Sequence, residues 1–531
     1  MNKTLAAAIA ALLAFGSAQA APAGKGAPRF DISLQHLSSI GTDASVGSTG
    51  AEIVSYDRKT RRAFAINSQD NDLAVIDLSN PAAPILLEKL PLDVYGAGLN
   101  GVDTHDGLVA VAVEASPKTD PGKVVFVDAR TLAVRGAVTV GALPDMLTFD
   151  DDGQRVLVAN EGEPESYLAG AVNPEGSISI IDLGRDVARA TVRTADFRAF
   201  SKEALLAMGV RVFGPGATAA QDLEPEYITL KGRTAWVTLQ EANAVAVLDV
   251  PTATVTDIVP LGLKDHLLAG QGLDASDRDG GTINIANWPV LGMYQPDAIA
   301  SYRIGSQQFL VTANEGDSRS SDDFPGFNEE VRLGNAAYQL DPVRFPDPTA
   351  LKNTAALGRL NVTNASGDID GDGDFDEIHV FGARSFSIWT GQGELVWGSG
   401  DQFEQFFANP ANGYASIFNA GHGNNNLDDR SDNKGPEPEG VALGRISGRT
   451  FAFVGLERIG GVMAYDVSNP YEPTFAAYAN TRSVTEVKGD LGAEGVEFVA
   501  AEDSPNGRPL LLVGNEVSRT VSVFQVNTTK R

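Results

Sequence analysis

Short apolar stretches of roughly four to seven residues recur along the chain, rich in Val, Ile and Phe and bounded by Gly, Pro, Asp and Asn. Stretches of this length and composition predict β-strands rather than helices. They come in units. Each unit has a small residue or proline, an acidic residue, a strand, a turn and a second strand. Another acidic residue, a short loop and a third strand that usually ends in Asp follow. The first units begin near 52, 100 and 145, a spacing of roughly 40–50 residues that is typical of β-propeller blades.

Seven such units can be aligned along the chain. Their first strands open at residues 51–54, 100–102, 144–145, 225–228, 296–299, 438–441 and 493–496. Seven units close a ring, so we predict an all-β fold, a seven-bladed β-propeller over residues 51–526. An array of β-sandwiches is the alternative arrangement of the same strands.

Longer gaps between units predict insertions near 186–225, 317–367 and 400–437, and a short helix is expected at 201–208. In the fifth unit the outer strands are delayed to residues 377–389.

The two ends of the chain carry different signals. Residues 1–20 contain Lys3, an apolar run at 5–15 and small residues up to Ala20, which is the pattern of a secretory signal peptide. The apolar run is short for a membrane span, which needs about 20 residues, so an N-terminal anchor is the less favoured alternative. The segment 21–50 contains a strand-like stretch at 29–38 that can close the last blade, and 527–531 forms a tail. We therefore expect an exported protein, periplasmic or extracellular, with no transmembrane segment in the mature chain.

Composition narrows the possible partners. The net charge of −28 argues against nucleic acid and anionic lipid, which require a positive surface. The absence of cysteine excludes disulfides, thiol catalysis and thiolate metal sites, so a packed core must supply the stability.

The acidic residues follow the repeat. In an antiparallel pair the start of the first strand lies beside the end of the second, and the first strand of a propeller blade lies nearest the axis. Each blade therefore brings one opening and one closing residue to the same mouth of the central channel. The opening residues are Glu52, Asn100, Asp145, Glu226, Asp297, Glu439 and Glu494, and the closing residues are Ser68, Glu114, Glu161, Glu241, Glu315, Glu457 and Glu516. Twelve of the fourteen are carboxylates, whereas 69 of 531 residues in the whole chain are acidic.

Crowded carboxylates resist ionising together unless a cation lies among them. Oxygen ligands without Cys or clustered His favour Ca²⁺, with Mg²⁺ as the alternative. The alternative for each single residue is a turn cap that accepts hydrogen bonds from backbone N–H groups. As metal ligands at the channel mouth we predict Glu52, Asp145, Glu161, Glu226, Asp297, Glu315, Glu439, Glu457, Glu494 and Glu516.

A separate acidic loop lies at residues 368–376. It places aspartates at 368, 370, 372, 374 and 376 around Gly371 and Gly373. Acids at loop positions 1, 3, 5 and 9 with a glycine at position 6 can wrap one Ca²⁺. His379 stands where an EF-hand has Glu, so the loop is not an EF-hand. We predict that Asp368, Asp370, Asp372, Asp374 and Asp376 form a calcium loop followed by a strand at 377–380. A plain flexible turn is the alternative.

Three phrases carry a family resemblance: 314–319 (NEGDSR), 381–389 (FGARSFSIW) after the acidic loop, and 430–440 (RSDNKGPEPEG). With these phrases the chain resembles the choice-of-anchor I family, which is similar to the mesenchyme-specific cell surface glycoproteins. The resemblance runs from about residue 39 to 526, and it implies a seven-bladed propeller with a calcium-related surface role. It implies no established reaction.

The sequence leaves binding and catalysis open. It contains no Gly-x-Ser-x-Gly elbow, Walker loop, dinucleotide fingerprint or His-Glu-x-x-His motif, and its five histidines are scattered. We favour a calcium-binding scaffold or surface-associated protein, whose partner can be a surface component. The alternative is a metal-dependent phosphoesterase, similar to alkaline phosphatases or propeller phytases, acting on a phosphorylated small molecule. In that case Arg319, Lys434, Arg458 and Arg519 are the phosphate-binding candidates, although they can equally balance the acidic ring.

Overall fold

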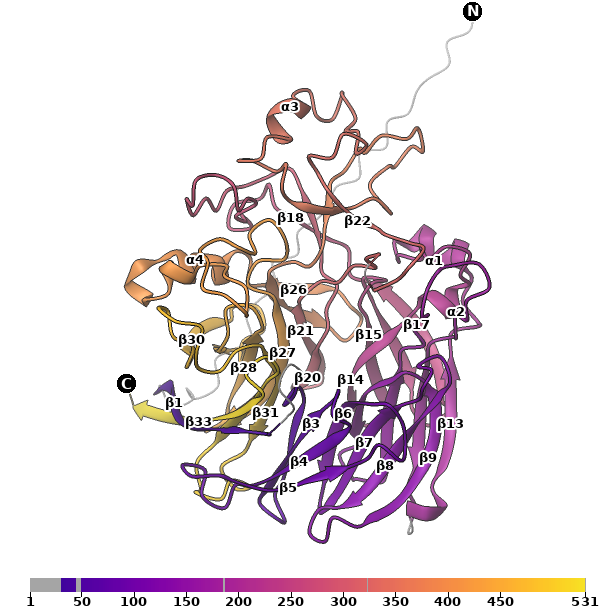
Figure 1. Cartoon of the computed structure of the whole chain (residues 1–531), viewed down its shortest axis with the longest axis vertical. Coiled ribbons are helices and arrows are strands. Elements are labelled where there is room, and N and C mark those ends of the chain that lie inside the picture. Colours follow the sequence, from indigo (N-terminus) through magenta and orange to yellow (C-terminus); the bar gives the residue numbers. More distant parts are fainter. Residues whose placement is uncertain (1–29, 44–48, 185–186, 322, 531) are drawn as a thin grey trace, which may run out of the picture.

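The computed structural model describes residues 30–43, 49–184, 187–321 and 323–530. The expected signal peptide at 1–20 lies outside these described residues. Seven four-stranded sheets surround a central axis, and successive strands within each sheet are antiparallel (Figure 1). The predicted seven-bladed β-propeller is confirmed.

The blades are numbered here in chain order. Blade 1 contains β2 (Val54–Asp57), β3 (Arg62–Asn67), β4 (Asp72–Asp77) and β5 (Ile85–Pro91). Blade 2 contains β6 (Gly98–His105), β7 (Leu108–Glu114), β8 (Pro121–Asp128) and β9 (Val134–Ala142). Blade 3 contains β10 (Pro144–Phe149), β11 (Arg155–Asn160), β12 (Ser177–Asp182) and β13 (Thr191–Asp196). Blade 4 contains β14 (Pro225–Lys231), β15 (Thr234–Leu239), β16 (Ala244–Asp249) and β17 (Thr254–Pro260).

The remaining blades follow the longer gaps. Blade 5 contains β20 (Ile299–Ile304), β21 (Gln307–Asn314), β25 (Ser385–Thr390) and β26 (Leu395–Gly398). Blade 6 contains β27 (Pro438–Ile446), β28 (Arg449–Leu456), β29 (Val462–Asp466) and β30 (Thr474–Ala479). Blade 7 contains β31 (Ala493–Val499), β32 (Leu510–Asn515), β33 (Thr520–Lys530) and β1 (Phe30–Gly41).

Middle strands are continuous apolar runs because both of their faces are buried between blades. In β3, Phe64 and Ile66 pack toward blade 2, while Ala63 and Ala65 pack toward blade 7. All four side chains are fully buried. The core is therefore a ring of interfaces between neighbouring sheets rather than one central cluster.

Strand β1 joins the two ends of the chain in one sheet. It runs antiparallel to β33, from Phe30 opposite Lys530 to Gly41 opposite Thr520. Residues 527–530, which the sequence suggested as a free tail, continue β33. A strand from the start of the chain thus completes the last blade.

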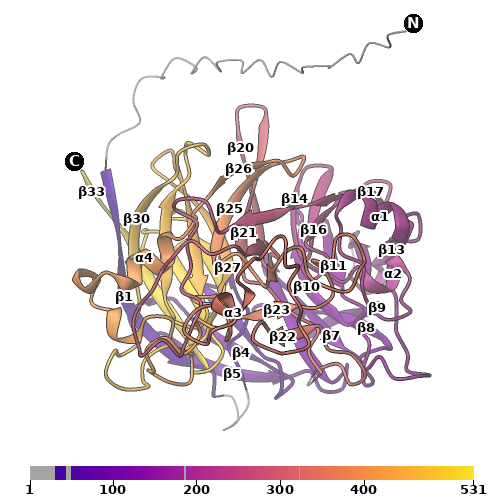
Figure 2. The ribbon, with the colours of Figure 1, turned by 90° about the horizontal axis from the view of Figure 1, so that it is seen from above.

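Inserted segments gather at one end of the ring, where they form a cap made of residues 263–293 and 317–380 (Figure 1). The cap contains one sheet of β18 (Leu263–Asp265), β19 (Leu291–Met293) and β24 (His379–Val380), and a second of β22 (Glu330–Arg332) and β23 (Asn361–Thr363). Helix α3 (Pro348–Leu351) belongs to it, and Figure 2 shows α3, β22 and β23 over the middle of the molecule. The cap has its own apolar core, built around residues such as Leu273, Leu340 and Leu360.

The other helices lie outside the cap. The predicted short helix is confirmed as α1 (Lys202–Met208), which Ser201 caps by accepting the Ala204 N–H at 3.2 Å. The segment 186–225 also holds α2 (Ala219–Asp222), the short turn η1 (Val187–Arg189) and strand β13 of blade 3. The insertion between blades 5 and 6 holds α4 (Gln402–Ala408), η2 (Pro410–Asn412) and η3 (Ala415–Ile417).

Two sequence expectations need correction. The segment 263–293 is an insertion that the spacing did not reveal. The strand expected at 377–380 is only His379–Val380, and it pairs in parallel with β19 in the cap instead of joining blade 5. Among the described residues, no helix combines the length and hydrophobicity required to cross a bilayer.

Candidate metal centre at the channel mouth

A bulge at the start of most inner strands turns the opening acid toward the axis. The antiparallel register shifts between Pro144 and Leu147, between Pro225 and Ile228, and again between Pro438 and Val441. Blades 2 and 7 show the same irregularity around Asn100 and Glu494. A bulge places two residues opposite one and re-aims a side chain, so these five blades present the opening residue at the mouth instead of in the sheet. The inner strand pairs of blades 1 and 5 have no such shift.

The opening and closing residues meet as the antiparallel argument requires. Ser68 donates its hydroxyl to Glu52 at 2.5 Å, and Asn100 hydrogen-bonds Glu114. In the other blades the pairs are acid against acid, as in Glu226 with Glu241 and Asp297 with Glu315. The fourteen positions therefore lie in seven pairs, one in each blade, and neighbouring pairs interact across blade boundaries.

Asparagines buried at the ends of second strands hold the closing acids in place. Asn160 donates to the hydroxyls of Ser177 and Ser179 on β12, at 3.3 and 3.0 Å. Asn314 similarly donates to Ser387 at 2.8 Å and Asn515 to Ser522 at 2.6 Å. Because each asparagine is hydrogen-bonded to the third strand, the backbone of the acidic residue that follows it is held in position.

Burial and mutual repulsion raise the pKa of nearly all ring carboxyls. The pKa of Asp145 rises to about 7, and that of Glu516 to about 8, with burial as the larger cause and neighbouring carboxylates as the next. Burial raises the pKa of Glu52 as well. Burial together with nearby carboxylates raises the pKa values of Glu114, Glu161, Glu226, Glu241, Asp297, Glu439 and Glu494. The repulsion crosses blade boundaries, since Glu52 is the carboxyl that acts most strongly on Glu494. A divalent cation would remove this repulsion and favour the charged form.

Three ring oxygens are buried without a hydrogen-bond partner. They are one carboxylate oxygen, Oε2, of each of Glu226, Glu439 and Glu494. Glu226 is only 7% exposed. A buried polar atom that lacks a partner costs on the order of 1–3 kcal/mol, and more when it is charged. These orphaned oxygens are the observation that fits a cation at the mouth.

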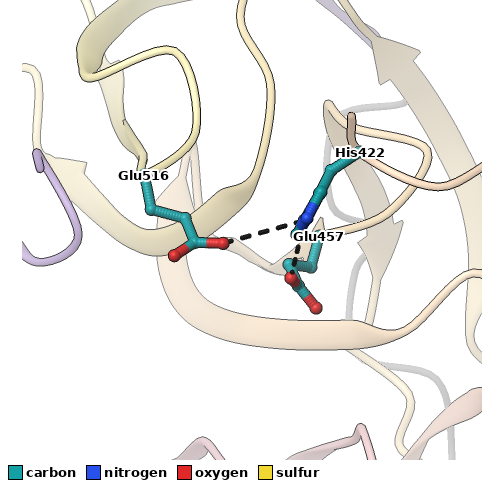
Figure 3. A group of neighbouring side chains, drawn as sticks. All are labelled: His422, Glu457 and Glu516. Atoms are coloured by element: carbon teal, nitrogen blue, oxygen red, sulfur yellow. Dashed lines mark hydrogen bonds and ion pairs between the residues drawn. The ribbon is translucent and has the colours of Figure 1, made fainter. Parts of the chain in front are cut away.

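The sequence analysis did not identify His422, which reaches the mouth from the insertion between blades 5 and 6. Its Nδ1 lies 3.1 Å from Glu457 and 3.8 Å from Glu516, so the three side chains point toward a shared volume (Figure 3). One donor atom from each lies within 4.8 Å of the others. Arg458 Nη1 stands 2.8 Å from the same Nδ1, and it can donate there only when that nitrogen is unprotonated. In that state the Nδ1 lone pair accepts the Arg458 N–H, so a metal at Nδ1 would have to replace this hydrogen bond.

Glu437 is a second residue that the sequence analysis missed. It is fully buried and binds three cations: Arg430 at 2.6 Å, Arg458 at 2.8 Å and Lys434 at 3.4 Å. Despite its burial, these charges hold the pKa of Glu437 well below its usual range. Glu437 also falls within 4.8 Å of Glu315 and Glu457 in a second carboxylate triad.

The phosphate-binding candidates occupy different positions. Lys434 Nζ donates to Glu315 at 2.6 Å and to the carbonyl of Gly316 at 2.5 Å, and Arg458 binds Glu437 and Glu457. Both stand at the mouth and are engaged with its acids.

Arg319 is closed off from solvent, and Arg519 lies in the turn that follows Glu516. Arg319 is completely buried, with Nη1 at 2.5 Å from Asp222 and Nη2 at 2.5 Å from Glu224, so an external phosphate cannot reach it. Arg519, in the turn before β33, has positive φ and accepts a hydrogen bond from Thr42 N–H through its carbonyl.

Below the mouth, a cavity of about 370 Å³ follows the axis. Inner strands of all seven blades line it, and Asp145, Asp297, Glu439 and Glu494 are among the lining residues. Asp103 and Glu497, acids that the sequence analysis did not single out, line the same cavity.

The acidic loop at 368–376 lies in the cap, away from the repeat. Oxygens of Asp368, Asp370 and Asp376 lie within 4.8 Å of one another, whereas Asp372 and Asp374 are not part of that group. Backbone N–H groups of Gly371 and Gly373 donate to Asp368 at 2.7 and 3.1 Å. The loop already folds back on its own carboxylates, and three of the five predicted ligands converge.

Comparison with known proteins gives a consistent result. The family model described as the choice-of-anchor I domain matches residues 52–470. Gigasin-3a of Magallana gigas is 31% identical over 194 residues, which are 33% of this chain and 67% of that protein. The mesenchyme-specific cell surface glycoprotein of Strongylocentrotus purpuratus is 30% identical over 282 residues, 47% of this chain but only 36% of that protein.

Two solved structures superpose on this chain at low TM-score and low sequence identity. Hydrazine synthase of Kuenenia stuttgartiensis superposes with a TM-score of 0.45 and 12% identity, covering 92% of this chain and 98% of that one. The Swd1 β-propeller domain of Myceliophteria thermophila gives a TM-score of 0.42 and 8% identity, covering 89% and 96%.

Proposed function

Because the chain belongs to the choice-of-anchor I family, we propose that it is an exported, surface-associated β-propeller that binds divalent cations, Ca²⁺ above all, at its channel mouth. The observation that carries the proposal is the set of buried oxygens of Glu226, Glu439 and Glu494 that have no partner. The cell surface glycoprotein among the similar proteins supports the location.

The balance of charge at the mouth supports cation binding. Lys434 and Arg458 are the cations that contact ring acids there, and both also bind Glu437. Glu437 lies outside the rings, so it already offsets part of the positive charge of Lys434 and Arg458. The rings contain twelve carboxylates. Bound cations can offset the excess without protonating the acids, and oxygen-rich sites of variable geometry suit Ca²⁺.

His422 extends the ligand set beyond oxygen. Carboxylates alone favour Ca²⁺ or Mg²⁺, whereas an imidazole beside two carboxylates also accepts Mn²⁺ or Zn²⁺. The triad of His422, Glu457 and Glu516 can therefore differ in metal selectivity from the carboxylates of the rings.

The test is metal binding by chelator-stripped protein. Equilibrium dialysis against Ca²⁺, Mg²⁺, Mn²⁺ and Zn²⁺, followed by elemental analysis, should give bound Ca²⁺ in the wild type. The variants E457Q and E516Q should lose bound ion. E472Q makes the same charge change at an exposed outer turn and should match the wild type. Wild-type stoichiometry in both mouth variants would refute the proposal.

A metal-dependent phosphoesterase is the second candidate, favoured by the position of Lys434 and Arg458 beside the ring acids. Cations next to a metal-binding carboxylate cluster can hold phosphate oxygens. Metal-loaded protein should then hydrolyse a chromogenic phosphomonoester or phosphodiester, and K434A should remove the turnover. Absence of turnover with each of the four metals across pH 5–9 would leave binding as the function.

A further inference from the structure

A second group of acids lies outside the rings, where the cap meets the insertion between blades 5 and 6. Asp274 and Asp279 belong to the cap segment between β18 and β19, and Asp428 belongs to the segment between η3 and β27. One carboxylate oxygen from each lies within 4.8 Å of the other two. Asp274 and Asp428 are both 1% exposed.

Local hydrogen bonds orient these acids and leave oxygens unused. Asp428 Oδ1 accepts the hydroxyl of Ser431, and Asp279 Oδ1 accepts the backbone N–H of Thr282 at 3.0 Å. The second oxygen of each, Oδ2, is buried and has no hydrogen-bond partner. Two buried carboxylate oxygens without donors, facing a third acid, are tolerated in the charged form only when a positive ligand lies among them.

The neighbouring charges do not supply that ligand. Glu404 is also 1% exposed, and its Oε2 has no partner. Arg384 binds the other oxygen of Glu404 at 2.8 Å and the backbone carbonyl of Asp274 at 2.6 Å. Burial, followed by repulsion from these acids, raises the pKa of Asp428 to about 8. Arg384 and the buried Lys264, which acts on Glu404 and donates to the carbonyls of Ala383 and Gly400, thus stand against four carboxyls.

We propose that Asp274, Asp279 and Asp428 bind a Ca²⁺ ion that fastens the cap to the insertion between blades 5 and 6. Calcium binds oxygens at roughly 2.3–2.6 Å, so donor atoms within 4.8 Å of one another can all reach one ion. Asn419, fully buried, has an unpartnered Oδ1, and its amide group donates to Ser431, the residue that orients Asp428. This carbonyl oxygen is a candidate fourth ligand.

The ion would join segments that are separated by about 150 residues in sequence, which Arg384 and Arg359 also bridge: Arg384 through the Asp274 and Ser431 carbonyls, and Arg359 through the Asp277 and Asp432 side chains. Asp274 also accepts the Ser276 and Asn284 N–H groups, at 3.4 and 2.5 Å, so binding would order the loop between them. The predicted role is structural: the ion sets the position of the cap over the mouth.

The variant D279N tests the site with little risk to folding. Asparagine keeps a carbonyl oxygen that can accept the Thr282 N–H, so only the charge is lost. Chelator-stripped D279N, dialysed against CaCl₂, should hold one Ca²⁺ fewer per chain than the wild type. D429N makes the same change at the exposed neighbour of Asp428 and should keep the wild-type number.

Hydrogen exchange locates the effect. In wild-type protein, CaCl₂ should slow amide exchange in 276–284 and 428–431, and D279N should abolish this protection. D428N should behave as D279N does; if it fails to fold, D279N decides alone. Folded D279N with wild-type stoichiometry and protection would overturn the proposal, as would equal ion loss in D429N. Because E457Q and E516Q leave this group intact, its ion should persist in them even if the mouth proposal fails.

Discussion

Glu497 is a single channel residue whose ionisation should affect the stability of the protein. It lines the axial cavity below the rings, and burial, followed by the charge of Asp103, raises its pKa to about 8. A carboxyl with a raised pKa stays protonated in the folded state while the unfolded chain has already released its proton. The folded state therefore binds more protons between about pH 4.5 and 8, and stability falls as pH rises through that window.

The variant E497Q should remove this part of the pH dependence. It mimics the protonated carboxyl, so it should match the wild type near pH 5 and be more stable at pH 8 by about 1–2 kcal/mol. Urea unfolding in chelator at the two pH values measures the difference, with E472Q as the control for charge. A wild-type slope in E497Q would show that Glu497 ionises freely in the folded protein.

Site residues within the repeated blade strands could be predicted from the sequence, whereas those in an insertion could not. Glu226 and Glu241 could be predicted because strand pairing alone puts the start of one strand beside the end of the next. His422 and Glu437 could not, because they belong to an insertion without periodicity. Glu437 does stand two residues before Glu439 in a proline-flanked phrase, which is the one local signal that could have pointed to it.

At the scale of elements, glycines after the opening residues fasten neighbouring blades together. A Cβ on Gly440 would lie 2.0 Å from the carbonyl oxygen of Glu494, and one on Gly495 would lie 2.8 Å from that of Glu52. Gly495 N–H donates to this Glu52 carbonyl at 3.1 Å. Successive inner strands thus touch through backbone at the mouth, which sets the spacing of the ring acids.

Substituting Gly440 should disturb both packing and binding. In G440A the added methyl group must push against backbone, so we expect a loss of about 1–3 kcal/mol and weaker Ca²⁺ binding at the mouth. A Cβ on Gly398 would meet only the Ser387 hydroxyl, at 3.8 Å, so G398A is the matched control. Denaturant unfolding and calcium dialysis check the two effects. Equal stability of G440A and G398A would show that the blades separate easily.

The acidic loop of the cap gives a second prediction at this scale. The double variant D370A/D372A should lower the melting temperature in Ca²⁺ but not in chelator, because its effect comes from lost ion binding. The single variant D370A should account for most of the change, since Asp370 belongs to the converging group and Asp372 does not. Equal losses with and without Ca²⁺ would mean that the loop is a structural turn only.

Elements of the blades were easier to predict than those of the cap. Blade strands recur and are buried on both faces, so their apolar runs stand out along the chain. The cap strands β18, β19 and β24 span three, three and two residues, and the parallel pair of β19 with β24 joins positions 88 residues apart. Such a strand pair cannot be predicted from the periodicity of hydrophobic residues or from the spacing of the repeats.

Across the whole molecule, charge and architecture oppose each other. A closed ring of seven blades necessarily converges on its axis, and here the converging positions are mostly acids in a chain with a net charge of −28. Carboxylates that converge on the axis repel one another, and this repulsion lowers the stability of the fold unless counterions bind there. Folding and the proposed cation binding are therefore coupled, and the stability of the whole protein should depend on both pH and Ca²⁺.

That joint dependence can be measured on the wild-type protein. Ring carboxyls such as Asp145 and Glu516 have pKa values raised to about 7 and 8. The folded state without metal therefore holds protons that the unfolded chain has lost, and in chelator the melting temperature should fall as pH rises from 5 to 8. Bound Ca²⁺ replaces those protons, so in excess Ca²⁺ the fall should shrink or vanish, and addition of Ca²⁺ at pH 7 should release protons into weak buffer. Mg²⁺ at the same ionic strength separates site binding from general screening. A melting temperature that drops equally with pH in Ca²⁺ and in chelator, with no proton release, would mean that the ring acids take up no cation.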